Sequence, residues 1–333
     1  MEISVIGVAS GPKSSNWFSG KVKPLTNSKD LCAISDVHYQ GHSWSIVKLI
    51  VLGGWVYVYT TIIPHYFQDY GYVDLLAGPG TTHVQETDDV VIGSPFVARN
   101  FARNPFKSYV FFETKSEMCK ALSERVRLTE GKCRILNSDC NERIRSAFTD
   151  EKTHYLVFAD NEGFDVVWNT IEVMLRAKTD ILINFPTSMV PRTAADTRTS
   201  SALDRFYGDK SWLEAQDREG YLQIYLQKLK NRFKELRRTD AYVSNIRVGT
   251  ESYFYDIILV CKMGRFVEAW DWLKKKWDWR SPRIIENTLD ILMNRATGMD
   301  LFMNDLNKEV TQFEPKPPKR KKNKELTEYI SKP

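Results

Sequence analysis

The sequence has few metal-ligating side chains and no arrangement of them that is typical of zinc. Its 333 residues include five Cys and five His, and no two cysteines form a Cys-x-x-Cys pair. Structural zinc needs four close nitrogen or sulfur ligands, and Cys133 and Cys140 bracket a candidate strand without nearby histidines, so we expect no metal site. An odd number of cysteines without a secretory start predicts free thiols in a reducing cytosol.

Long hydrophobic runs are also scarce. Residues 1–11 carry no basic start before their apolar run, so no signal peptide is expected. Residues 46–63 are the one candidate for a membrane span, but Lys48, Gly53 and Gly54 interrupt them. Pro64 follows directly. We therefore predict a buried helix that ends at this proline rather than a membrane span.

Charge of one sign is scarce outside the C-terminus. The formal net charge is +5, and residues 314–333 supply +4 of it through seven Lys or Arg against three Glu. The rest of the chain is therefore nearly neutral. This basic, proline-containing segment is predicted to be disordered, and it would serve either as a solubilising tail or as an electrostatic arm for nucleic acid.

Residues 265–280 interleave five aromatic residues with lysines and arginines. Such a pattern can bind single-stranded nucleic acid by stacking and phosphate contact, or it can form an amphipathic helix with buried tryptophans. We favour the buried helix.

What the sequence does contain is a series of apolar segments that end in polar residues. Residues 72–80, YVDLLAGPG, predict a buried strand with Asp74 at its end, followed by a loop of small side chains. Glycine permits turns that other residues disfavour, and it lets a ligand approach the backbone. An acid before a Gly-x-Gly loop, here Gly78 and Gly80, is typical of an S-adenosylmethionine site, although Gly-Pro-Gly is also an ordinary tight turn.

Candidate strands recur along the chain after this one. They cover residues 108–113, 133–139, 154–160 and 180–186, and helical patterns separate most of them. This alternation predicts a parallel sheet with right-handed crossovers, whose ligands lie at the carboxyl ends of the strands. The polar residues at those ends are Glu113, Asp139, Asp160 and Asn184. Any of the acids can instead be a helix cap, and Asp139 precedes a helical pattern.

The loops and the C-terminal half add further expectations. Ser94 and Pro95 are typical of a helix start, with a capping hydroxyl and a proline in the first turn. Residues 81–93 before them would arch over the ligand as an insertion. Residues 189–199 are polar and poorly periodic, so they predict a mobile loop beside the site.

A long helix is expected over residues 211–236, with its aromatic and leucine positions in the core. Residues 243–249 and 253–262 predict a closing antiparallel hairpin.

The order and wording of these segments resemble the three-Cys-motif partner proteins, a prokaryotic methyltransferase-like family named for a neighbouring three-cysteine protein. YVDLLAGPG and the GSP of residues 93–95 are the specific part, and the likeness spans residues 44–262. It implies an α/β, Rossmann-like class I methyltransferase fold with a mostly parallel sheet, a terminal antiparallel hairpin and added helices. It also implies S-adenosylmethionine as the cofactor and a three-Cys-motif protein as a candidate partner.

Within this resemblance each polar residue has an expected role. Asp74, Gly78 and Gly80 would form the loop around the methionine part of S-adenosylmethionine, and a side chain added at Gly80 would fill ligand space while the domain stayed folded. Glu113 would hold the ribose, and Asp139 would face the adenine. Asp160 and Asn184 would lie nearest the methyl donor, as candidate catalytic residues.

One departure from the family favours a different function. Relatives tend to have an Asp-Pro-x-Gly-like turn where this chain has Asp160-Asn161-Glu162-Gly163. The missing proline favours a non-catalytic, methyltransferase-like partner protein that docks another protein or nucleic acid. The methyl acceptor is not indicated, because neither an Asn-Pro-Pro-Tyr element nor a cysteine placed for pyrimidine methylation is present.

The expected domain layout has four parts. They are an N-terminal extension over residues 1–43, a methyltransferase domain over 44–264, a helical addition over 265–313 and the basic tail over 314–333. The protein is expected to be cytoplasmic and not to associate with a membrane.

Overall fold

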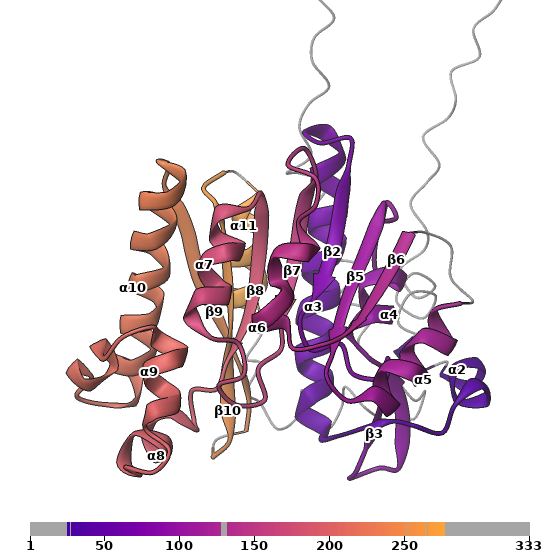
Figure 1. Ribbon diagram of the computed structural model, residues 1–333, viewed down its shortest axis with the longest axis horizontal. Helices are drawn as coiled ribbons and strands as arrows, with labels where there is room; N and C mark the ends of the chain where they lie inside the picture. The colour runs from indigo at the N-terminus through magenta and orange to yellow at the C-terminus, as the bar shows by residue number, and fades with distance from the viewer. Residues whose placement is uncertain (1–24, 27, 128–131, 251, 265, 277–333) are drawn as a thin grey trace, which may run out of the picture.

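A seven-stranded sheet organises the computed structural model, which describes residues 25–26, 28–127, 132–250, 252–264 and 266–276. The strand order is β6 (Lys132–Asn137), β5 (Ser108–Glu113), β2 (Tyr70–Asp74), β7 (His154–Ala159), β8 (Thr179–Phe185), β10 (Phe254–Lys262) and β9 (Ala241–Gly249). The first five strands are parallel, and β10 is antiparallel to both of its neighbours. This order confirms the Rossmann-like methyltransferase fold with its closing hairpin (Figure 1).

The central strands β2 and β8 are buried along their whole length because both faces of the sheet are covered. Every residue of β2 and β8 is buried, whereas β6 at one edge is half exposed. Successive side chains point to opposite faces. Tyr72 accordingly packs in the core on one face and Val73 in the core on the other.

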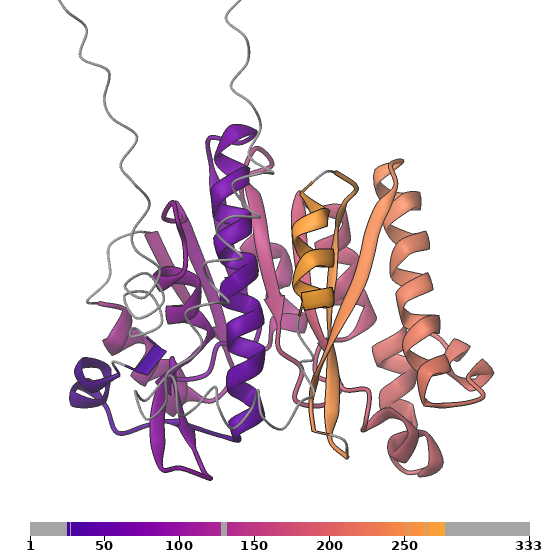
Figure 2. The ribbon, with the colours of Figure 1, turned by 180° about the vertical axis from the view of Figure 1, so that it is seen from behind.

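Helices cover the two faces in separate sets. α3 (Ser43–Ile62), α4 (Ser94–Asn100) and α11 (Val267–Lys276) contribute to one core, in front in Figure 2. The opposite face carries α6 (Cys140–Arg143), α7 (Trp168–Arg176), α9 (Ser201–Tyr207) and α10 (Arg218–Arg237), in front in Figure 1. The result is a helix–sheet–helix sandwich.

The apolar segment over residues 46–63 is helix α3, and it lies in the core. The stretch Ser45–His65 is long and apolar enough to cross a membrane, but 94% of its 18-residue window is buried inside the protein. Helix α3 ends at Ile62, and a 3-10 turn, η1 (Ile63–His65), carries Pro64. Trp55 of this helix meets Trp270 of α11 edge to face, with ring centroids 5.4 Å apart. The predicted buried helix is therefore confirmed.

A second, three-stranded sheet stands beside the carboxyl ends of the parallel strands. The predicted insertion over residues 81–93 forms the hairpin of β3 (Thr81–Val84) and β4 (Asp89–Ile92). Strand β1 (Tyr39–Gly41) pairs with β3 in parallel. Helix α2 (Lys29–Ile34) precedes β1 and contacts α5 (Ser116–Val126).

Some predicted elements need correction. The helix expected over residues 211–236 is divided into η3 (Ser211–Glu214) and α10, because Asp217 accepts a hydrogen bond from Gly220 N at 2.7 Å and starts a new helix there. The expected loop over residues 189–199 contains helix α8 (Val190–Ala195), anchored by the fully buried Val190.

The aromatic stretch over residues 265–280 is only partly described. Trp270 is fully buried, which confirms the core interpretation for this residue. Trp277 and Trp279, most of the helical addition over 265–313 and the whole tail over 314–333 lie outside the described residues.

All five cysteines are free. Among the residues that the structure describes, no group of three or more His, Cys, Asp or Glu side chains is arranged to hold a metal ion.

Candidate functional site

The loop after β2 lies where the winding of the sheet reverses. The chain proceeds from β2 to β5 and β6 on one side, and then to β7 and β8 on the other. Leu75 N donates to Phe158 O at 3.0 Å and Ala77 N to Phe112 O at 2.9 Å, so the start of the loop is bonded to both neighbouring strands. Such a switch point is the usual ligand site of a doubly wound sheet.

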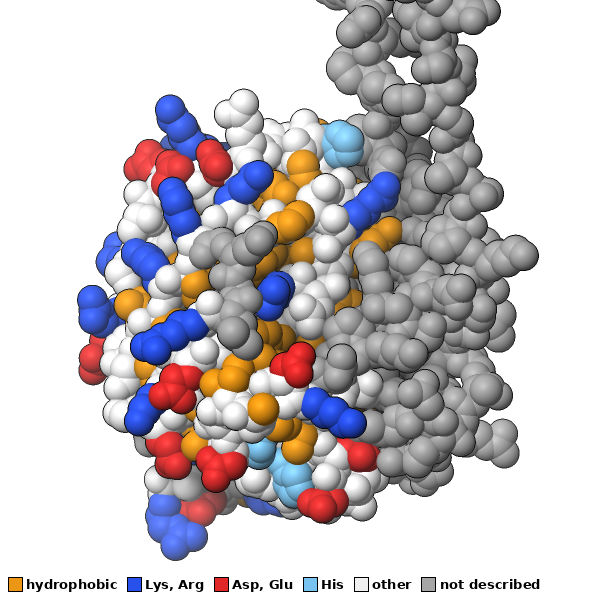
Figure 3. All heavy atoms as spheres, turned by 90° about the vertical axis from the view of Figure 1, so that its right-hand side faces the viewer, with side chains coloured by type: hydrophobic (Ala, Val, Ile, Leu, Met, Phe, Trp, Pro, Cys, Tyr) orange, Lys and Arg blue, Asp and Glu red, His pale blue; other side chains and the backbone are white. Residues whose placement is uncertain are grey.

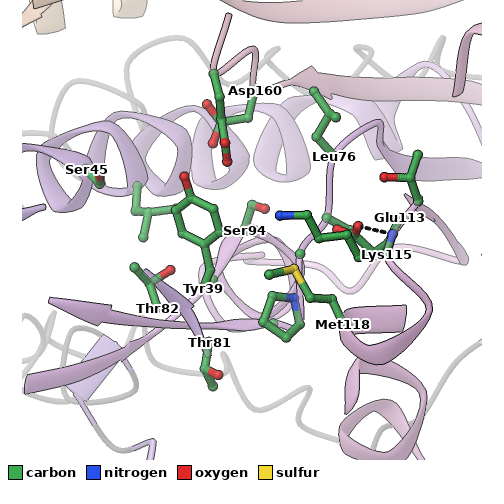
Figure 4. Close-up of a pocket in the computed structure, with 18 of the residues that line it drawn as sticks. Tyr39, Ser45, Leu76, Thr81, Thr82, Ser94, Glu113, Lys115, Met118 and Asp160 are labelled. Atoms are coloured by element: carbon green, nitrogen blue, oxygen red, sulfur yellow. Dashed lines mark hydrogen bonds between the residues drawn. The ribbon is translucent and has the colours of Figure 1, made fainter. Parts of the chain in front are cut away.

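A cavity of about 300 Å³ opens at this switch point (Figure 4). Its wall includes the loop residues 76–80, Glu113 at the tip of β5, Asp160 after β7 and Tyr39 of β1. A second cavity, of about 490 Å³, adjoins it and is lined by residues including Asn161, Asn184, Pro186 and Tyr253. We call these the loop cavity and the adjoining cavity. Tyr39, Ser45, Lys48 and Glu162 line both.

The two glycines of the loop have different surroundings. Both have positive φ, +59° at Gly78 and +85° at Gly80. A Cβ at Gly78 would meet no protein atom within 4 Å, whereas one at Gly80 would come within 2.6 Å of the Phe96 ring and 3.0 Å of Leu122. The expectation that a side chain at Gly80 leaves the domain intact is therefore wrong, because that side chain would enter the core.

Asp74 is fully buried behind the loop. Its carboxylate accepts hydrogen bonds from Tyr72 Oη at 3.1 Å, from Leu76 N at 3.4 Å and from the Ser94 hydroxyl. Burial raises the pKa of Asp74 to about 7, and the neighbouring charge of Asp160 adds to this. Asp74 thus ties the loop to the start of α4.

The predicted capping role of Ser94 needs correction. Helix α4 begins at Ser94 with a proline in its first turn, as expected, but its N-cap is Gly93 and no side chain caps it. The Ser94 hydroxyl is used by Asp74 instead. A buried carboxylate competes well for a nearby hydroxyl, because hydrogen bonds to charged groups are the stronger ones.

The acids of the next two strands have different positions. Glu113 lines the loop cavity, is 9% exposed, and accepts a hydrogen bond from Lys115 N at 2.7 Å (Figure 4). Asp139 lines neither cavity described above. Its side chain accepts from Asn141 N at 2.8 Å and caps α6, which is the alternative that the sequence left open.

Asp160 and Asn184 lie side by side at the tips of β7 and β8. Asn184 Nδ2 donates to Asp160 Oδ1 at 3.0 Å and to Asn161 O at 2.8 Å. Oδ2 of Asp160 forms an ion pair with Lys48 of α3. Both carboxylate oxygens of Asp160 therefore have partners.

Sequence reasoning missed all four residues of the shared wall, among them Lys48, Tyr39 and Glu162. The Tyr39 hydroxyl hydrogen-bonds to Glu162 and points toward the Asp160 side of the cavity in Figure 4. The surrounding protein raises the pKa of both side chains. The sequence held a hint of the role of Lys48, since it is the one charged residue in an otherwise apolar helix. The sequence held no hint of the role of Tyr39, because its strand has only three residues and is distant in sequence from the other residues of the site.

No protein-family model and no curated protein matches the sequence. Among solved structures, the chain is similar to a Legionella pneumophila protein described by the family model DUF519, with 10% identity, a TM-score of 0.42, and 78% of this chain and 91% of that one covered. It is similar to the complex of Trm1 from Pyrococcus horikoshii with S-adenosyl-L-methionine, with 15% identity, a TM-score of 0.40, and 66% and 56% covered. It is also similar to an rRNA methylase from Streptococcus thermophilus, with 10% identity, a TM-score of 0.33, and 60% of this chain and 89% of that one covered.

Proposed function

We propose that this chain is an S-adenosylmethionine-dependent methyltransferase. The observation that carries the proposal is the loop cavity: it stands at the switch point of the sheet, between a glycine loop with an open side and the carboxylate at the tip of the next strand. Doubly wound sheets bind nucleoside-containing ligands at this place, and an acid at the tip of the second strand commonly accepts the ribose hydroxyls.

The residues of the loop cavity fit S-adenosylmethionine. Open space beside Gly78 allows a ligand to approach the backbone. Glu113 would accept from the ribose, and Leu76 and Met118 offer apolar surface for a base. The wall carries four carboxylates and two lysines, an excess of negative charge that suits a sulfonium cation. The contact between Asp139 and the adenine stays a prediction. In the structure the Asp139 side chain caps helix α6.

When bound, the cofactor would supply an activated methyl group, so the protein has to orient the acceptor and take up its proton. The adjoining cavity would hold that acceptor, because it meets the loop cavity at Tyr39, Lys48 and Glu162. Asp160 and Asn184 would fix the wall between the two cavities through their mutual hydrogen bond.

For the family and the partners of this chain, the proposal follows the resemblance described above. YVDLLAGPG and GSP support membership of the three-Cys-motif partner family, with a three-Cys-motif protein as partner and nucleic acid as a candidate contact of the basic tail. The side of the protein drawn in Figure 3 mixes Lys and Arg with Asp and Glu rather than presenting one sign of charge. The tail is proposed for nucleic-acid contact because it carries +4 of the formal net charge of +5.

A non-catalytic partner function is the second candidate. It is favoured by Asp160, whose two oxygens are engaged by Lys48 and Asn184 in a turn that lacks the family's proline. A paired carboxylate is a poor base, so this turn can serve structure alone.

Calorimetry with S-adenosylmethionine tests whether the loop cavity binds the cofactor at all. The full chain should bind the cofactor, and Glu113→Ala should weaken binding about tenfold or more, because each lost hydrogen bond to a charged acceptor costs roughly 1.5–3 kcal/mol. Glu113→Gln is the control, since it keeps an oxygen for Lys115 N and should bind with intermediate affinity. Unchanged affinity in a folded Glu113→Ala protein would remove this residue from the site.

A further inference from the structure

The loop cavity and the adjoining cavity meet at two charged residues, Lys48 and Glu162. Lys48 forms its ion pair with Asp160. The carboxylate of Glu162 is instead held by a neutral group, the Tyr39 hydroxyl, and its side chain remains accessible to solvent. An accessible carboxylate therefore stands where the two cavities join.

We propose that the methyl acceptor is an amino group held in the adjoining cavity, and that Glu162 rather than Asp160 takes its proton. This inference rests on the proposed methyltransferase function. Asp160 is unsuited to the task because Lys48 occupies its Oδ2 and Asn184 its Oδ1. Glu162 lines both cavities and lies two residues away from Asp160 on the same turn.

Asn184 is the second observation, and it indicates an amino group. Its Nδ2 donates to Asp160 Oδ1 and to Asn161 O, so the amide orientation is determined by two acceptors. Its Oδ1 is buried without a hydrogen-bond partner in the described part of the chain, and Asn184 lines the adjoining cavity. An amino group brings two N–H donors, one for Asn184 Oδ1 and one for Glu162. A buried acceptor left unpaired is costly, so a ligand that pairs it is favoured.

The groups that face Glu162 come from several elements. Tyr39 of β1 and Lys48 of α3 favour its ionised form, and Asp160 and Asp165 in its own loop oppose it. Tyr253, in the turn after β9, interacts with it across the adjoining cavity. Partial burial of the carboxyl is the largest influence, and it raises the pKa of Glu162 above its ordinary value.

The proposed step balances without a further reactant. The acceptor nitrogen uses its lone pair to bond the methyl carbon while the methyl–sulfur bond breaks, and the electron pair of that bond stays on sulfur. The product amine loses its extra proton to the Glu162 carboxylate, which returns it to solvent. The Tyr39 hydroxyl positions that carboxylate.

Two cofactor analogues test the geometry without a known acceptor. S-adenosylhomocysteine lacks the transferred methyl, and sinefungin carries an amine in its place. Calorimetry on the full chain should show that sinefungin binds about tenfold or more tightly than S-adenosylhomocysteine, because its ammonium meets the Glu162 carboxylate. Glu162→Gln should abolish this preference, which is read as the ratio of the sinefungin affinity to the S-adenosylhomocysteine affinity of the same protein. The matched control is Glu151→Gln, which changes an exposed residue before β7, at the opposite end of that strand from Glu162.

The outcomes separate the inference from the function on which it rests. If neither analogue binds the wild-type chain, the methyltransferase proposal itself fails. If both bind and the Glu162→Gln protein keeps the preference, Glu162 does not face the reacting position and the inference is overturned. A preference that survives Glu162→Gln but disappears in Asp160→Asn would return the role to Asp160.

Discussion

Gly78 and Gly80 are two residues apart in one loop, but a side chain added at each would meet different surroundings. The Cβ direction at Gly78 is open, and that at Gly80 points at Phe96 and Leu122. A substitution at Gly78 therefore tests the ligand, whereas one at Gly80 tests the fold.

We expect Gly78→Ala to fold with a modest loss of stability, roughly 1–2 kcal/mol, because alanine is strained at positive φ. It should bind S-adenosylmethionine more weakly, since its methyl group extends into the space beside the cavity. Gly80→Ala should lose more stability, because the same strain is joined by the clash with Phe96. Urea unfolding and calorimetry on both variants measure the two effects. Normal binding by Gly78→Ala would show that the loop is only a turn.

Asp74 should make the stability of the folded protein depend on pH. Its pKa in the folded protein is about 7, well above its ordinary 3.8, so folding favours the protonated form. The stability that this contributes is complete below about pH 4 and is lost as the pH rises through about 7. Relative to Asp74→Asn, the wild-type protein should lose up to roughly 4 kcal/mol over that interval.

Urea unfolding of both proteins between pH 4 and pH 7.5 measures this as a difference in slope. The baseline stability of the variant is not the readout, because asparagine also changes the hydrogen bonds to Tyr72 and Ser94. Asp180, whose pKa burial likewise raises to about 7, titrates in both proteins and cancels in the comparison. Parallel curves would show that Asp74 is ionised throughout.

At the scale of the elements, helix α5 anchors several neighbouring segments through one buried side chain, Arg125. Arg125 is fully buried on this helix and donates to the backbone oxygens of Leu31 at 3.0 Å, Ser35 at 2.6 Å, Val37 at 2.8 Å and Pro79 at 2.7 Å. The guanidinium thereby satisfies carbonyls at the end of α2, which a helix end otherwise leaves without donors. One side chain joins α2, the approach to β1 and the glycine loop.

We expect Arg125→Met to lower the free energy of unfolding by about 3 kcal/mol or more, because it leaves several carbonyl oxygens without donors. It should also weaken cofactor binding, since the Pro79 carbonyl loses its anchor. Arg127→Met, an exposed arginine two residues further on, is the matched control and should change little. Hydrogen exchange should quicken in residues 28–38 and 76–80 of the first variant alone. Equal behaviour of the two variants would contradict the anchoring role.

At the scale of the whole molecule, charge is divided between a nearly neutral body and a basic end. Residues 314–333 carry +4 of the formal +5 and lie outside the described residues. If nucleic acid is a partner, the attraction that does not depend on sequence should come mainly from this segment.

Deleting residues 314–333 should weaken binding to a duplex DNA oligonucleotide and flatten its dependence on salt. Each phosphate contact contributes about −0.9 to the log–log slope on duplex DNA, because it releases counterions. Fluorescence anisotropy over a range of salt concentrations measures the slope. A full-length protein with the seven basic residues of the segment changed to Gln is the control for chain length. An unchanged slope in both would identify the segment as a solubilising tail.

The pattern of local burial determined most of the fold. Apolar runs that end in acids marked β2, β5 and β7, and an apolar segment ending at Pro64 marked α3, because a segment covered on all sides has little choice of side chains. The same runs located Glu113 and Asp160 on the wall of the loop cavity, since parallel strands present their carboxyl ends at one edge of the sheet.

Tertiary structure alone decided how those residues are used. Lys48 and Asp160 are 112 residues apart, and Tyr39 reaches Glu162 from a small second sheet. Asp74 turns inward to Ser94, and Gly80 faces the core while Gly78 faces open space. None of these outcomes is written in a local pattern, because the partner of a buried polar group is chosen by packing between segments distant in the chain.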